Sequence, residues 1–543
     1  MSIYSTVESG TKQYRSRFHK SISFSKKFDC RFGEAIPVLA KFVLPGDVWR
    51  IGGQALVRFQ PMQTPSLTPC YMKVRYFFVP LRLLDSNTEL ILTGSKDGHL
   101  YSGTLPDFPN LFYGANKINF PDCYKIKKYS FWDYLGCQIG DYENFATDSC
   151  LPAQYWNKAY LRIRYDYYDD ENIGVIHNTY PDFETFYADT QKQGADVNIF
   201  GVALPKDYFT SSLPWQLKGV APTITLGIGS VDFTNCFDLN NYSDQAFPVG
   251  VRDVPEKLVA GTVVGNKISD AGISFTQNAL NALNKAQVSL SGSLDADDIR
   301  TMFAETRIFE RLARSGSRYT EFLRSNFGTA PADDTMQRAQ YLGGWKLPIV
   351  TTEVLQTAAD GPNPVGTMRG HGITNGGNNI STFYAKEFGV IFGIAHFLPQ
   401  IEYTQGCPKE FSYKSRFDFF NPSFQHLSEQ EIRKGEIFIG SDGENDNTFG
   451  FQAYANELRS SVNMTVGDFR DTLKAWTQSI DYGNTRPNLN FAFINSFSYL
   501  ANFNKCFAVT STTHRPILCQ FYNDLDVYRP MVKYSTPGLV DHL

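Results

Sequence analysis

The first 33 residues hold the clearest candidate for chemistry in this chain, because basic side chains alternate there with aromatic ones. Lys and Arg side chains neutralise phosphates, and the rings of Phe18, Phe24 and Phe28 could stack on unpaired bases. The segment shows no helical spacing, so we predict an extended arm that contacts single-stranded nucleic acid. An equally open alternative is an arm that pairs with a neighbouring subunit while water solvates its charges. The candidate nucleic-acid contacts are Arg15, Arg17, Lys20, Lys26, Lys27 and Arg31.

Motifs for catalysis or for cradling a nucleotide are absent or incomplete. No G-x-x-x-x-G-K-[ST], G-x-S-x-G or H-E-x-x-H pattern occurs. The glycine-rich run Arg369–Gly377 misses G-x-G-x-x-G by one position, and we interpret it as a flexible loop. His396 lies on an apolar strand pattern and is interpreted as a hydrogen-bonded core histidine. We therefore predict no catalytic residue and no cofactor.

Two acidic segments raise the question of a metal site. Asp442–Asn447 resembles the start of a calcium loop, but the Gly and Glu that an EF-hand needs at positions six and twelve are missing. A calcium site that uses Asp166, Asp169, Asp170 and Glu171 remains an alternative, since hard cations need oxygen ligands that converge in space. The nine cysteines form no C-x-x-C pair, which argues against zinc. We predict no metal.

The composition excludes several classes of protein. The chain has 543 residues, of which 42% are hydrophobic and 20% charged, and this excludes an intrinsically disordered protein. The net charge is −4, but residues 1–33 carry seven basic and two acidic residues, so a basic arm precedes an acidic body. The polar N-terminus lacks a secretion signal, and the longest apolar run is too short to span a bilayer. We expect a cytoplasmic product with reduced thiols and no membrane insertion.

Strand patterns cluster near both ends of the chain. Residues 71–79 alternate apolar with mainly polar positions, residues 388–398 alternate large with small ones, and alternation returns at 517–521. The best helical stripe is Asp295–Ala313, followed by a short helix at about Arg318–Asn326. The loop-rich middle lacks a clear period. These patterns predict a barrel built from both chain ends, with the middle inserted between its strands.

Eight short segments form a recognisable series. They are 43–47 (VLPGD), 77–84 (FFVPLRLL), 313–322 (ARSGSRYTEF), 337–344 (QRAQYLGG), 403–406 (YTQG), 417–420 (FDFF), 426–430 (HLSEQ), and the C-terminal RPM and PGLVDH at 529–542. In this order they resemble the major capsid proteins of the Microviridae, the small icosahedral single-stranded DNA phages. The gokushovirus-like branch is the most similar.

The resemblance implies a mainly β fold, namely an eight-stranded antiparallel jelly roll of the viral capsid type with long loop and short-helix insertions. With it we expect a basic arm at 1–33 and a single jelly-roll domain at 34–543. Barrel strands would come mainly from 34–80 and 381–530. Insertions would fill about 81–380, and a surface protrusion would lie within them at about 175–260.

The resemblance also implies a function without enzymatic activity. Pentameric building blocks would assemble into a T=1 icosahedral shell that encloses circular single-stranded DNA. The protrusion would be a candidate for attachment to a host surface receptor. Scaffolding and minor DNA-pilot proteins would be further partners, and the protein would be a virion component assembled in the bacterial cytoplasm. Two other classes stay open, a β-rich carbohydrate-active enzyme and a receptor-binding tail protein.

Overall fold

The computed structural model divides the chain into two compact units, Met1–Gln216 with Ala313–Leu543, and Leu217–Leu312. The first unit is mainly antiparallel β-structure with short helices. The structure describes residues 18–84, 125–141, 155–180, 182–192, 199–218, 262–264, 267–269, 296–314, 338–355, 368–379, 382–424 and 429–531.

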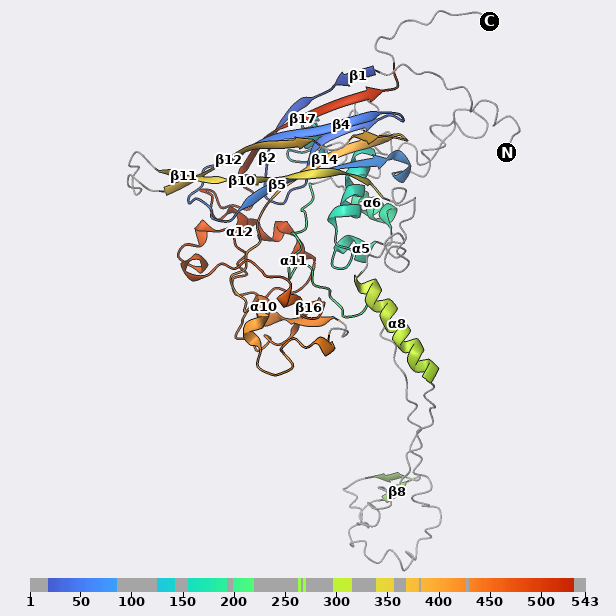
Figure 1. Cartoon of the computed structure of the whole chain (residues 1–543), viewed down its shortest axis with the longest axis vertical. Coiled ribbons are helices and arrows are strands. Elements are labelled where there is room, and N and C mark those ends of the chain that lie inside the picture. The colour runs from blue at the N-terminus through green and yellow to red at the C-terminus, as the bar shows by residue number, and fades with distance from the viewer. Residues whose placement is uncertain are drawn as a thin grey trace, which may run out of the picture. The chain divides into compact units, whose positions relative to one another are not determined.

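Two antiparallel sheets make up the first unit. Figure 1 shows strands from the two chain ends side by side, with β4 next to β17. The larger sheet runs β1 (Phe18–Ser21), β17 (Ile517–Arg529), β4 (Val48–Phe59), β12 (Met368–Asn379), β11 (Thr351–Leu355), with β2 (Phe24–Cys30) on β17 and β13 (Phe383–Tyr384) on β4. The smaller runs β10 (Gln340–Ile349), β5 (Cys70–Pro80), β14 (Gly389–Pro399), β3 (Ile36–Val43).

The hydrophobic core lies between the inner faces of these two sheets. Strand β17 shows why, because its odd-numbered residues from Ile517 to Val527 are buried while its even-numbered ones are exposed or half-buried. Across the core, the Trp345 ring stacks on Phe521 with ring centroids 6.0 Å apart. The Asn523 side chain donates a 3.1 Å hydrogen bond to the Val38 carbonyl. Alternating apolar positions therefore hold the sheets face to face.

Glycine is required where the backbone turns or approaches closely. Gly46, in the turn between β3 and β4, has φ +90°, a conformation that side chains disfavour. Asp47 closes this turn by accepting hydrogen bonds from the Leu44 backbone at 3.0 Å and the Trp49 indole at 3.2 Å. In β14, a Cβ on Gly393 would lie 2.9 Å from the Tyr76 ring. The small residues on one face of 388–398 thus allow the Tyr76 ring to approach the backbone closely.

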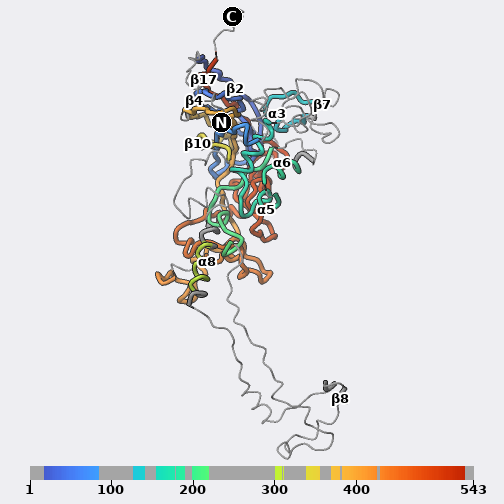
Figure 2. Tube along the Cα trace, turned by 90° about the vertical axis from the view of Figure 1, so that its right-hand side faces the viewer, coloured from blue at the N-terminus to red at the C-terminus, as the bar shows by residue number. Residues whose placement is uncertain are grey.

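Helices cover part of the outer face of the four-stranded sheet. They are α3 (Phe131–Leu135), α4 (Tyr155–Ile163), a π-helical turn (Arg164–Tyr168), α5 (Val175–Thr179) and α6 (Phe183–Lys192). In Figure 2, α3, α5 and α6 lie on one side of the strands. The rings of Phe131, Trp156 and Tyr160 pack around Phe392 of β14. Aromatic burial against the sheet therefore fixes these helices.

The segment between β14 and β17 folds into short elements. It contains β15 (Gln430–Arg433), α10 (Lys434–Ile437), β16 (Thr448–Gln452), α11 (Phe491–Ile494), α12 (Leu500–Asn504), and 3₁₀ turns at 409–412, 422–424, 456–458, 467–470, 474–476 and 496–499. Elsewhere a 3₁₀ turn covers Leu81–Leu83, and β6 (Lys125–Ile126) pairs with β7 (Gly140–Asp141). The second unit contains β8 (Thr262–Val264) paired with β9 (Lys267–Ser269), and most of α8 (Ala296–Arg314). Among the described helices, none is long and apolar enough to cross a membrane.

Several predicted elements are confirmed. Strands β5, β14 and β17 occupy 70–80, 389–399 and 517–529, and α8 begins and ends within one residue of the predicted helix. The predicted short helix at Arg318–Asn326 lies outside the described residues.

Other expectations differ from the structure. Residues 18–30 form β1 and β2 within the larger sheet rather than a separate arm, because they pair with β17 along their length. Strands β10, β11 and β12 lie in the range expected for insertions. The glycine-rich run expected to be a flexible loop is part of β12, which β4 and β11 flank with backbone hydrogen bonds. Short helices lie between residues 155 and 192, within the range in which loop and short-helix insertions were expected.

Candidate nucleic-acid and assembly surfaces

The six predicted nucleic-acid contacts do not form one group. Lys20 of β1 and Lys27 of β2 are exposed, while Lys26 and Arg31 are half-buried. Arg15 and Arg17 lie outside the described residues. Residues 26 and 27 point to opposite faces, since Lys26 pairs with Phe521, which faces the core, and Lys27 with Gln520, which faces outward.

Lys26 makes hydrogen bonds within the protein. Its ammonium donates hydrogen bonds to the Pro37 carbonyl at 2.6 Å and to the Tyr134 carbonyl. Burial lowers the pKa of Lys26 to about 7, and the nearby Asp133 carboxylate offsets only part of this shift. The side chain thus ties β2 to β3 and to the C-terminal end of α3.

Arg31 belongs to a charged network at the end of the sandwich. Its Nε lies 2.8 Å from the Glu34 carboxylate, which also binds the Arg515 guanidinium at 2.6 Å. Arg515 donates a further 2.7 Å hydrogen bond to the Tyr134 hydroxyl and lies over the Tyr129 ring. Glu34 and Arg515 are 1% and 8% exposed, so this network is a structural element.

The outer face of the seven-stranded sheet carries further cations that the sequence reading missed. Arg50 and Arg58 of β4 are exposed on the same face as Lys27. Acidic residues accompany them, since Asp526 lies directly opposite Arg50 and Asp524 is two residues away along β17. Alternation along 55–59 identifies this face, but the cross-strand neighbours become visible only in the folded sheet.

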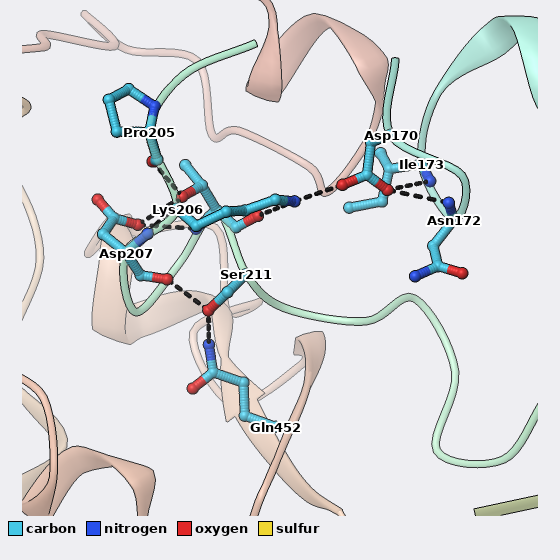
Figure 3. A network of polar contacts seen from close by, with 9 residues as sticks. Asp170, Asn172, Ile173, Pro205, Lys206, Asp207, Ser211 and Gln452 are labelled. Atoms are coloured by element: carbon cyan, nitrogen blue, oxygen red, sulfur yellow. Dashed lines mark hydrogen bonds and ion pairs between the residues drawn. The ribbon is translucent and has the colours of Figure 1, made fainter. Parts of the chain in front are cut away.

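A polar network fixes two of the inserted loops (Figure 3). The Lys206 ammonium contacts the Asp170 carboxylate and donates to the Thr210 carbonyl at 3.0 Å. Burial would raise the pKa of Asp170, but the charge of Lys206 and backbone N–H donors from Asn172 and Ile173 bring it below its ordinary value. Ser211 then accepts a 3.1 Å hydrogen bond from Gln452. The network joins 170–173, 205–211 and β16.

Two of the four carboxylates considered for calcium, Asp166 and Asp170, have partners within the protein. Asp166 accepts hydrogen bonds from the Ala339 backbone at 2.8 Å and from Arg162 at 3.1 Å, and Asp170 is bound by Lys206. Asp169 is mostly buried and packs near Arg164. Over the described ranges, no three His, Cys, Asp or Glu side chains are grouped so that they could hold a metal ion.

A tyrosine-lined cavity of about 170 Å³ lies between the loops around 403–411 and 457–470. The carboxylates of Glu410, Glu436 and Glu457 line it. Tyr208 donates to Glu436 at 2.9 Å and Tyr413 to Glu457 at 2.8 Å, and burial raises the pKa of Glu436. A glycoside hydrolase requires a pair of carboxylates in a cavity, but here Glu436 and Glu457 accept hydrogen bonds that join loops together.

An exposed aromatic segment lies beside this cavity, at residues 411–424. Phe411, Phe417, Phe419 and Phe420 are 76%, 62%, 58% and 43% exposed. Phe420 stacks on Tyr454 with centroids 5.9 Å apart, so the segment is anchored to the fold rather than extended away from it. Grouped exposed aromatic side chains are typical of protein–protein interfaces.

Comparison with known proteins decides between a capsid protein and an enzyme. The family model described as capsid protein (F protein) matches residues 5–539. The chain belongs to this family of Microviridae capsid proteins. Members are structural components of the virion and not enzymes, so the carboxylates of the cavity have no catalytic role.

Individual relatives of this capsid family match over nearly their whole length. The capsid protein VP1 of Chlamydia phage 1 is 26% identical, over 97% of this chain and 96% of the relative. The VP1 of Bdellovibrio phage phiMH2K is 28% identical, over 96% and 95%. The VP1 of Spiroplasma virus 4 is 25% identical, over 97% and 95%. The gokushovirus-like resemblance of the eight sequence segments is thereby confirmed.

Proposed function

We propose that the eight principal strands form a capsid-type jelly roll. Numbered in chain order, these strands are β2, β3, β4, β5, β10, β12, β14 and β17. In the larger sheet the order is β2, β17, β4, β12, which are the first, eighth, third and sixth of these strands. In the smaller sheet the order is β3, β14, β5, β10, which are the second, seventh, fourth and fifth. Such alternation between two packed antiparallel sheets supports two interlocked Greek keys.

This chain would act by self-association into a T=1 icosahedral shell, with pentameric building blocks, around circular single-stranded DNA. The observation that carries this proposal is the match of the capsid family to residues 5–539. The exposed aromatic segment at 411–424 supports it, because an apolar surface of this kind needs a partner, and a symmetric shell supplies another copy. Many modest contacts then sum to a stable particle.

We also propose that the N-terminal region contacts the genome, through four of the six basic residues predicted from the sequence. Lys20 and Lys27 are exposed and could reach DNA, and Arg15 and Arg17 continue the same basic run. Lys26 and Arg31 have partners inside the protein, which favours a structural role for both.

Attachment to a host receptor would belong to the second compact unit. It spans Leu217–Leu312, whereas the expected protrusion began near residue 175. Residues 183–192 form α6, which contacts α4 in the first unit, so the earlier boundary is less well supported. A compact unit inserted in the sequence of the first unit suits a surface protrusion. Scaffolding and DNA-pilot proteins would be further partners.

Sedimentation and negative-stain imaging of the full chain test the proposal. Closed shells of uniform diameter, or pentamers that close when a scaffolding protein is added, would support it. A monomer that never associates and hydrolyses a glycan would overturn it. Replacing 217–312 with a short Gly-Ser linker should leave shells intact and abolish adsorption to host cells.

A further inference from the structure

The outer face of the four-stranded sheet carries three neighbouring cations on β5 and β10. Strand pairing sets Lys346 of β10 directly opposite Lys73 of β5, and Lys73 directly opposite His396 of β14. Arg75 lies two residues from Lys73 and therefore on the same face. Lys346 is exposed, and Lys73 and Arg75 are half-buried. Adjacent strands are about 4.8 Å apart, so these charges crowd together.

No acidic side chain neutralises this cluster in the described part of the chain. Within the described ranges, no carboxylate oxygen lies within 4.0 Å of the charged nitrogens of Lys73, Arg75 or Lys346. Burial lowers the pKa of Lys73, and the positive charges of Arg75 and Lys346 lower it further. Like charges directly opposite each other destabilise a sheet. The cluster therefore carries an unfavourable interaction that a bound anion would relieve.

The positive charges of the cluster also affect the neighbouring histidine, His396. His396 is 5% exposed, and its Nδ1 has no hydrogen-bond partner. Burial, followed by the charges of Arg75 and Lys73, lowers the pKa of His396 to about 3, so the ring stays neutral. His396 was expected to be a hydrogen-bonded core residue; it is buried, but its Nδ1 has no hydrogen-bond partner.

Tyrosine rings accompany the cations. The Lys346 ammonium lies 3.9 Å from the centroid of the Tyr71 ring, and the Arg75 guanidinium 5.4 Å from that of Tyr168. Tyr341, at the start of β10, is 49% exposed. Proteins that bind single strands without sequence preference combine cations along the backbone with rings on which bases stack. Both kinds of group lie together here.

We propose that this β5–β10 surface, formed by Lys73, Arg75, Lys346, Tyr71 and Tyr341, binds the phosphates and bases of single-stranded DNA. The inference rests on the proposed function, in which the shell encloses such DNA, and it names a site separate from the N-terminal strands. The seven-stranded sheet is less suitable, because Asp526 and Asp524 accompany its arginines. On the β5–β10 surface the cations have no such neighbours.

Binding of the full chain to a labelled oligothymidylate of about 16 nucleotides tests the site. Fluorescence anisotropy is measured at several salt concentrations for the wild type and for K73Q/K346Q. R50Q/R58Q, which removes two charges from the opposite side of the sandwich, is the matched comparison. We expect K73Q/K346Q to weaken binding about tenfold or more, and its salt dependence to fall by about 1.4 in slope, since each lost phosphate contact removes about 0.7. R50Q/R58Q should change the affinity and the salt slope by less than half of the changes seen in K73Q/K346Q.

Three outcomes would overturn the site. The first is that K73Q/K346Q binds the oligonucleotide with the same affinity as the wild type. The second is that R50Q/R58Q loses more affinity than K73Q/K346Q. The third is that the cluster binds an oligoglutamate peptide more tightly than the oligonucleotide. The third outcome would assign the cluster to an acidic segment of a partner. Tyr341→Ala gives an independent test, because it should weaken oligonucleotide binding at least fivefold without changing the salt slope.

Sedimentation of the same preparations separates this site from the proposed function. If K73Q/K346Q forms normal shells that retain less DNA, both ideas stand. If the wild type forms shells and the variant retains full DNA content, only the site fails. If the wild type forms no shell with any partner, the proposed function fails.

Discussion

The Glu34 carboxylate and the Arg515 guanidinium meet at 2.6 Å although 481 positions separate them in the chain. Glu34 precedes β3 and Arg515 precedes β17, so the pair joins the entry points of strands from both sheets. Both side chains are almost completely buried. Removing one partner of a buried pair leaves an uncompensated charge and costs about 3–5 kcal/mol.

We therefore expect Arg515→Met to lower the free energy of unfolding of the unassembled subunit by about 3–5 kcal/mol in urea titrations. The matched comparison is Arg82→Met, which breaks a pair with Glu387 whose side chains are 34% and 37% exposed. That change should cost less than about 1 kcal/mol. Equal losses in the two variants would contradict a special role for the buried pair.

Lys26 makes stability depend on pH in a direction that can be derived. Its pKa is about 7 in the folded chain and 10.5 when unfolded. Between these values the unfolded chain binds more protons than the folded one, so the contribution of Lys26 to stability rises with pH. Below pH 7 both states are protonated and the buried charge is fully unfavourable.

The measurement is the free energy of unfolding of wild type and Lys26→Met at pH 6.5, 8 and 9.5, roughly spanning the titration. The free energy of unfolding of the wild type should increase relative to that of Lys26→Met as pH rises. Groups that titrate in both proteins cancel in this difference. Lys27→Met, at the neighbouring exposed position, is the matched comparison. A constant difference for Lys26→Met would mean that this ammonium keeps an ordinary pKa.

The elements that the sequence predicted are those whose pattern arises within one strand. In β5, Met72 and Val74 face the core while Lys73 and Arg75 face outward, and this alternation is legible without the fold. β12 was not predicted as a strand because its Gly and Asn residues have low strand propensity. Its pairing with β4 and β11 makes it a strand, and no local sequence signal carries that information.

The candidate sites divide in the same way. Basic residues near the N-terminus are visible in the sequence, but the burial of Lys26 depends on the Tyr134 carbonyl of α3, 108 positions away. The cluster of Lys73 and Lys346 likewise depends on the register of β5 and β10. The sequence shows which residues are basic and could bind DNA. Only the neighbours across the strands distinguish basic residues with a structural role from those that are free to bind a ligand.

Close packing at Gly393 gives a further prediction. A Cβ there would lie 2.9 Å from the Tyr76 ring and 3.0 Å from the Leu39 Cβ, and both of these side chains are fully buried. Gly393→Ala should therefore lower the free energy of unfolding by about 1–3 kcal/mol through overpacking. Gly435→Ala, in the short helix α10, would place a Cβ 3.1 Å from its nearest atom, the Asn445 carbonyl oxygen, and should be tolerated better. Thermal unfolding of the two variants compares them.

The aromatic segment at 411–424 provides the sharpest test of assembly. Phe417 and Phe419 are mostly exposed, so their truncation removes little from the core of the subunit. If they pack against another copy in the shell, Phe417→Ser/Phe419→Ser should leave the unfolding free energy within about 0.5 kcal/mol of wild type. The concentration needed for assembly should rise at least about tenfold, because important interface side chains each contribute more than about 1 kcal/mol.

Light scattering against protein concentration, followed by sedimentation, measures this effect. Tyr384→Ser is the control, since Tyr384 is 53% exposed on the larger sheet, away from the segment. It should assemble like the wild type. Normal assembly of the double variant would show that 411–424 lies on a free surface of the particle. The exposed phenylalanines would then need a partner other than a second copy, since an uncovered aromatic surface repeated around a shell would promote aggregation of the particles.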